Sequence, residues 1–70
     1  MRKKLLIDLE RECIAILDYI VAKYGEDEEL LGNYLSEHFP IYTPVIMKMH
    51  RGEDYTNALS KLLSKINKGD

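Results

Sequence analysis

The pattern of apolar residues is longest and most regular between Leu5 and Tyr24, a stretch without glycine or proline. On an α-helix, which turns by about 100° per residue, most of these apolar side chains fall in one stripe about 120° wide. Such a stripe is typical of an amphipathic helix that packs on a core, so we expect one long first helix, ended by Gly25. The stripe consists of Leu6, Leu9, Cys13, Ile16, Leu17, Ile20 and Tyr24.

A second apolar row distinguishes this helix from an ordinary amphipathic one. Ile7, Ile14 and Val21 are spaced seven apart, so they share a face roughly 120° from the centre of the first stripe. We expect this row to stay exposed on one chain and to form a homodimer interface. Tyr19 and Tyr42, which lie off the predicted core faces, are expected at an interface too. The alternative is that the shorter helices wrap around the first helix and bury both rows.

Two shorter helices follow in the middle of the chain. Apolar residues at helical spacing predict a second helix from Leu30 to His38, which stops before Pro40. A third helix is predicted from Pro44 to Arg51, because Thr43 can cap its free amides and proline is tolerated in a first turn. Its expected inward side chains are Val45, Ile46 and Met49, and its expected outward ones are Met47, Lys48, His50 and Arg51.

The last helix has the cleanest pattern in the chain. Asp54 or Glu53 can cap it, and apolar residues then keep one face from Tyr55 to Ile66. Its opposite side carries a strip of lysines, Lys61, Lys65 and Lys68. No strand of any length is expected, so the sequence predicts an all-α fold: a compact bundle of about four helices within one domain, residues 1–70.

Size and cysteine content limit how such a domain is stabilised. A chain of 70 residues buries only about 60% of the surface that its unfolded form exposes, so its stability is expected to be marginal. One cysteine excludes an internal disulfide, and two histidines with it are too few for a structural zinc site. Oligomerisation is a remaining route to stability. The lone thiol favours a reducing, cytoplasmic setting.

Charge and candidate chemistry narrow the function. A net charge of -2 argues against a protein whose whole surface binds nucleic acid. No uncharged apolar stretch reaches the roughly 18 residues of a membrane span, and the polar side of the first helix mixes acidic and basic residues where a membrane-surface helix would be mainly basic, so no membrane association is expected. Cys13 lies within the apolar stripe, where a thiol is inert. Because no nucleophile, base or phosphate-binding motif stands out, we expect no enzymatic activity, cofactor or metal.

The sequence therefore predicts a small regulatory or adaptor protein that binds itself and an unidentified protein. The alternative is a helix-turn-helix DNA-binding regulator in which residues 44–51 form the recognition helix. In that alternative, cations of the third helix meet bases or phosphates and the lysine strip meets the DNA backbone. The residues concerned are Lys48, His50, Arg51, Lys61, Lys65 and Lys68.

Overall fold

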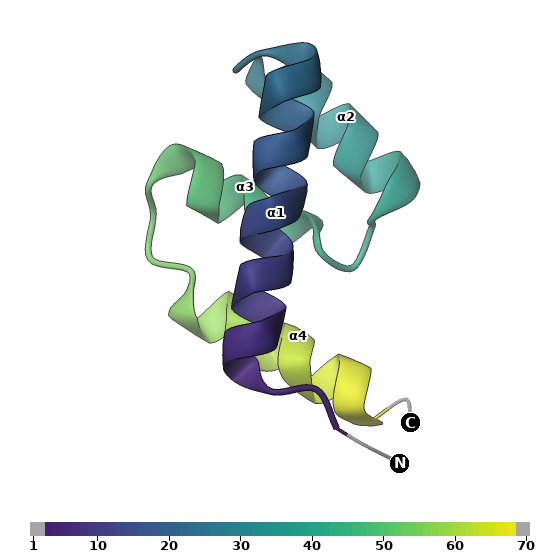
Figure 1. The fold of residues 1–70 in the computed structure, drawn as a ribbon, viewed down its shortest axis with the longest axis vertical. Helices are drawn as coiled ribbons and strands as arrows, with labels where there is room; N and C mark the ends of the chain where they lie inside the picture. Colours follow the sequence, from purple (N-terminus) through teal and green to yellow (C-terminus); the bar gives the residue numbers. More distant parts are fainter. Residues whose placement is uncertain (1–2, 69–70) are drawn as a thin grey trace.

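The computed structural model describes residues 3–68 and confirms the predicted fold (Figure 1). Four helices form a compact bundle, and no strand occurs among the described residues. The helices are α1 (Leu6–Tyr24), α2 (Glu28–His38), α3 (Thr43–Arg51) and α4 (Thr56–Lys68).

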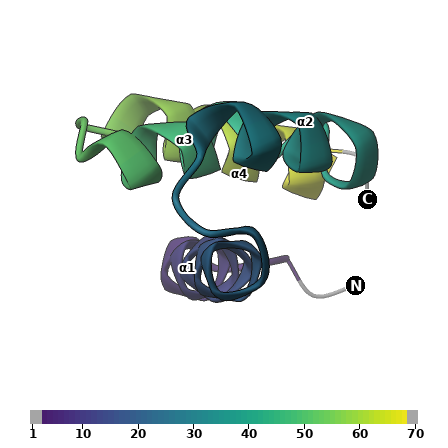
Figure 2. The ribbon, with the colours of Figure 1, turned by 90° about the horizontal axis from the view of Figure 1, so that it is seen from above.

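The helices are arranged in two layers of unequal composition. Figure 2 shows α1 alone in one layer and the three shorter helices together in the other. The Cα atoms extend over 36 × 23 × 15 Å, and the shortest dimension fits two stacked helices, which span about 13–15 Å. The second layer therefore covers α1 from one side.

The core lies between the two layers. Leu9, Cys13 and Ile20 of α1 are fully buried, which confirms the first stripe as the core-facing side of this helix. Leu6 belongs to the same stripe but is 45% exposed. The short helices contribute Leu31, Leu35, Val45, Ile46, Met47, Leu59 and Leu62 to the core.

Most helix ends follow from local chemistry that the sequence contains. Gly25 ends α1 with a positive φ of 78° and donates its N–H to the Val21 carbonyl at 2.8 Å. The Asp27 carboxylate caps α2 by accepting from the Glu29 N–H at 3.0 Å, so this helix begins two residues earlier than predicted. Asp54 accepts from the Thr56 N–H at 3.0 Å, which confirms it as the cap of α4.

Two predictions about α3 are wrong. The Thr43 hydroxyl does not cap the helix but donates to the Phe39 carbonyl at 3.0 Å, which fixes the preceding turn. Met47 was expected to point outward, yet it is 8% exposed. Its burial follows from the position of α3, which contacts all three other helices and so needs apolar residues on more than one face. Gly32 of α2 lies next to the end of the Met47 side chain.

Polar contacts on both edges of the buried stripe hold α1 on the second layer. Around the helix, Glu10 and Glu12 lie about 80° from the centre of that stripe, one on each side. Tyr55 donates its hydroxyl to Glu10 at 2.6 Å, and Tyr42 donates to Glu12 at 2.7 Å. The Lys4 ammonium also contacts Glu12 at 2.7 Å, and these hydrogen bonds lower the pKa of the Glu12 carboxyl.

Replacing Gly32 tests the packing of α2 on α3. A Cβ at this position would meet Met47 Cε at 3.9 Å, an ordinary van der Waals contact, and the backbone has no positive φ there. Gly32→Ala should therefore raise the free energy of unfolding by about 0.5–1 kcal/mol, measured by urea denaturation, because alanine loses less backbone entropy in a helix.

Gly52→Ala is the matched control. Its Cβ would meet nothing within 4 Å, but φ is 74°, so the same change should lower the free energy of unfolding by about 1–2 kcal/mol. A destabilised Gly32→Ala variant would show that α2 packs more tightly on α3 than the structure has it.

Candidate functional site: the outer face of α1 and a lysine-rimmed groove

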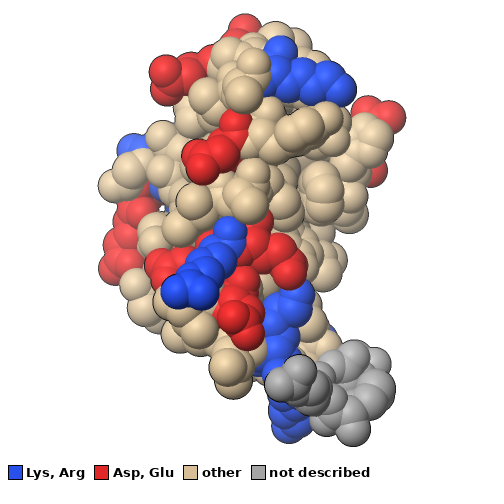
Figure 3. Space-filling view, in the orientation of Figure 1, with Lys and Arg blue, Asp and Glu red and all other residues tan. Residues whose placement is uncertain are grey.

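The side of α1 that faces away from the second layer carries large exposed apolar residues. Ile7 is 50% exposed and Ile14 is 42% exposed. Seven large apolar residues are exposed among the described ones, and Ile7 and Ile14 are the two that lie on this side of α1. Figure 3 looks onto this side, where uncharged surface dominates the upper half and acidic and basic side chains adjoin in the lower half. The seven are Leu5, Leu6, Ile7, Ile14, Tyr19, Leu30 and Ile41.

Small and charged residues complete this face. Ala15, Ala22, Arg11 and Asp18 are exposed and fall on the same half of the helix as the two isoleucines, within about 100° of Ile14. Neither Arg11 nor Asp18 forms an ion pair within residues 3–68. We call the surface formed by Ile7, Arg11, Ile14, Ala15, Asp18 and Ala22 the outer face of α1.

The other residues predicted at an interface lie elsewhere. Val21 is half-buried against the core, so it belongs to the edge of the outer face. Tyr19 is 54% exposed, but it projects about 140° around the helix from Ile14. Tyr42 is half-buried, and its hydroxyl is engaged by Glu12 at 2.7 Å. The structure therefore places Ile7 and Ile14 on the same side of α1 and the two tyrosines apart from them.

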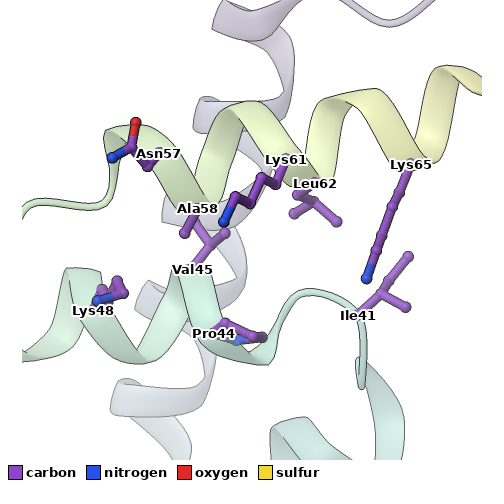
Figure 4. A pocket seen from close by; sticks show the side chains of 9 residues that line it. All are labelled: Ile41, Pro44, Val45, Lys48, Asn57, Ala58, Lys61, Leu62 and Lys65. Carbon is purple, nitrogen blue, oxygen red and sulfur yellow. The ribbon is translucent and has the colours of Figure 1, made fainter.

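Three of the predicted basic residues converge on a groove between α3 and α4. Lys48 reaches it from α3, and Lys61 and Lys65 reach it from α4 (Figure 4). The groove has a volume of about 430 Å³. In Figure 4, α1 passes behind α3 and α4, so the groove opens on the side of the second layer that faces away from α1. The residues lining this α3–α4 groove are Ile41, Pro44, Val45, Lys48, Asn57, Ala58, Lys61, Leu62 and Lys65.

The remaining cations of the predicted DNA-binding set are placed differently. Arg51 pairs with Glu28 at 2.9 Å and with Glu53 at 3.1 Å, and these carboxylates raise its pKa. The His50 side chain is 14% exposed, with Nε2 3.9 Å from a carboxylate oxygen of Glu26. Lys68 lines a separate hollow with Lys3 at the end of α4. The six residues therefore do not form one continuous basic surface.

Sequence reasoning missed several residues of these surfaces. The apolar lining of the groove, including Ile41 and Ala58, could not be assigned before α3 and α4 were placed side by side. Arg11 and Asp18 carry opposite charges and lie equally far from the midpoint between Ile14 and Ala15, a feature that is visible in the sequence. Only their position among exposed apolar residues marks them as interface candidates.

Three further features that could indicate a function are a reactive thiol, a metal site and a membrane-spanning helix. Burial raises the pKa of the Cys13 thiol to about 11, so the thiol is protonated at neutral pH and is a poor nucleophile. Across residues 3–68, no three His, Cys, Asp or Glu side chains are grouped so that they could hold a metal ion. No helix in this part of the chain is long and apolar enough to cross a membrane.

Comparison with known proteins adds no further information on function. No protein-family model matches the chain, no curated protein is significantly similar to it, and no solved structure is a significant match.

Proposed function

We propose that this protein is a small non-enzymatic adaptor or regulator that acts by binding proteins and that it forms a homodimer through the outer face of α1. The observation that carries the proposal is the one-sided cover of α1, which leaves Ile7 and Ile14 half-exposed on the same side of the helix, two turns apart. Exposed apolar residues that gather on one face of a small domain are typical of association sites. A second copy is the simplest occupant, since most oligomers are symmetric and use the same patch twice.

The charges on the outer face support an antiparallel dimer. A two-fold axis between Ile14 and Ala15 places Arg11 of one copy opposite Asp18 of the other, because both residues are equally far from that axis along α1. The charges that lack ion pairs within the described chain would then pair across the interface twice. The same axis places Ile7 opposite Ala22, so each large side chain meets a small one and the helices can approach closely.

The alternative of helix-turn-helix DNA binding has less support. Arg51 and His50 lie beside acidic side chains, and duplex DNA would have to displace these carboxylates or be repelled by them. The lysines that converge on the α3–α4 groove do so in a concave surface, whereas a recognition helix has to protrude into the major groove.

Ile14→Asp should convert the dimer to a monomer. The substitution places two charges near the axis of an apolar interface, so the dissociation constant should rise by about 100-fold or more. Light scattering after gel filtration measures the mass, and circular dichroism should show an unchanged helix content, because Ile14 is already 42% exposed. Leu30→Asp is the control: Leu30 is 49% exposed on α2, away from the outer face, and its replacement should leave the dimer intact. If the unchanged protein is a monomer at high micromolar concentration and Ile14→Asp unfolds it, the residue belongs to the core and the proposal is contradicted.

Charge reversal tests the antiparallel register separately. Arg11→Asp alone, or Asp18→Arg alone, places like charges opposite each other and should weaken the dimer by about tenfold in sedimentation equilibrium. The double variant Arg11→Asp/Asp18→Arg restores both pairs and should regain most of the lost affinity. Single variants that dimerise like the unchanged protein, or a double variant weaker than either, would exclude this register.

A further inference from the structure

The α3–α4 groove combines an apolar floor with a cationic rim. Val45 is 1% exposed and Leu62 is 3% exposed, so both are held firmly by the core beneath the groove. Ile41 stands at one end and is 51% exposed, which leaves a large aliphatic side chain beside the open space (Figure 4). The apolar surface open to a ligand side chain is therefore that of Ile41, Pro44 and Ala58, over a base of buried Val45 and Leu62.

The charge of the rim is of one sign. Lys48, Lys61 and Lys65 line the groove, and no acidic residue does. Lys61 and Lys65 form no ion pair within residues 3–68, and Lys48 has one carboxylate, that of Glu53, at 3.7 Å. Because Lys61 and Lys65 are four apart on α4, their stems lie about 6 Å apart, close enough to act on one ligand.

We propose that the α3–α4 groove binds a short acidic segment of a partner protein, with an apolar side chain on the floor and flanking carboxylates on the three lysines. The proposal deepens the proposed adaptor function, on which it rests, by naming the kind of partner. Charge complementarity selects an acidic segment and opposes a basic one. The volume of about 430 Å³ suits one or two apolar side chains rather than a folded domain.

The groove favours a peptide over nucleic acid. It contains no aromatic residue and no arginine among its lining side chains, whereas single-stranded nucleic acids are bound by stacking of bases on aromatic or guanidinium planes. An exposed isoleucine over buried valine and leucine is instead what an apolar peptide anchor requires. The groove also opens away from α1, so a dimer formed through the outer face of α1 leaves both grooves accessible.

Fluorescence anisotropy with a defined probe tests the proposal. The probe is a fluorescein-labelled synthetic helical peptide with two leucines on one face, flanked by glutamates, and the protein is the full chain. We expect saturable binding that weakens about fivefold in Lys61→Glu or Lys65→Glu and more than tenfold in the double variant. Ile41→Ser should weaken binding about fivefold without unfolding the protein, because Ile41 is 51% exposed.

Controls separate the groove from general electrostatics. Lys23→Glu changes the net charge as much as either single groove variant, but Lys23 lies in the last turn of α1, so it should alter binding less than twofold. A peptide with serine in place of both leucines should bind at least tenfold more weakly. Equal binding of the two peptides, or equal effects of Lys23→Glu and Lys65→Glu, would show that the peptide binds by nonspecific electrostatic attraction and would overturn the proposal.

Binding of a DNA duplex decides between a peptide and nucleic acid as the occupant of the groove. A random DNA duplex that binds more tightly than the leucine peptide, and whose binding is weakened by the same lysine variants, would assign the groove to nucleic acid and overturn the proposal.

The Ile14→Asp variant should bind the peptide within about twofold of the unchanged protein, because Ile14 lies on the other layer. Peptide binding by that variant therefore tests the groove whether or not the dimer exists. If the dimer proposal fails, the groove proposal still stands or falls on peptide binding, and the reverse also holds.

Discussion

The rest of the structure depends on the burial of one stripe of α1 against three short helices. Helices of 9 to 13 residues, such as α2, α3 and α4, are marginal by themselves in water and need an apolar partner. α1 supplies that partner with Leu9, Cys13 and Ile20. The Glu10 and Glu12 carboxylates then fix its rotation through tyrosines on either edge. The single layer of short helices covers one side of α1, and the opposite side of α1 remains exposed to solvent.

This constraint places the two candidate surfaces on opposite sides of the molecule. The outer face of α1 is the side that the second layer does not reach, and the α3–α4 groove opens on the far side of that layer. Each surface combines apolar residues with charges that have few partners within the described chain. A symmetric dimer through α1 would present two grooves outward, so self-association and partner binding would not compete for the same residues.

Local sequence patterns predicted the helices well. The candidate surfaces depend on how the helices pack against one another, which local patterns do not contain. The helix ends at Gly25 and Asp54 could be read from the sequence because capping depends on neighbouring residues. The burial of Met47 could not, because it depends on α2 and α4 flanking α3. The exposure of Ile7 and Ile14 was predicted from their spacing, and helix geometry alone separates Tyr19 from them, but the hydrogen bond of Tyr42 to Glu12 depends on how the second layer packs on α1. The groove joins residues of α3 and α4 that no sequence window contains.

Thiol chemistry at the centre of the outer face is the most direct measurement of whether α1 is covered by its own chain or by a second copy. In Ile14→Cys, the introduced thiols of two copies would face each other near the dimer axis, so mild oxidation should join them in a disulfide, while the native Cys13 thiol, fully buried and with a pKa of about 11, should not react. The oxidised variant should then run as a species of twice 8.2 kDa. Oxidised protein that remains as single chains of 8.2 kDa would contradict the dimer through α1.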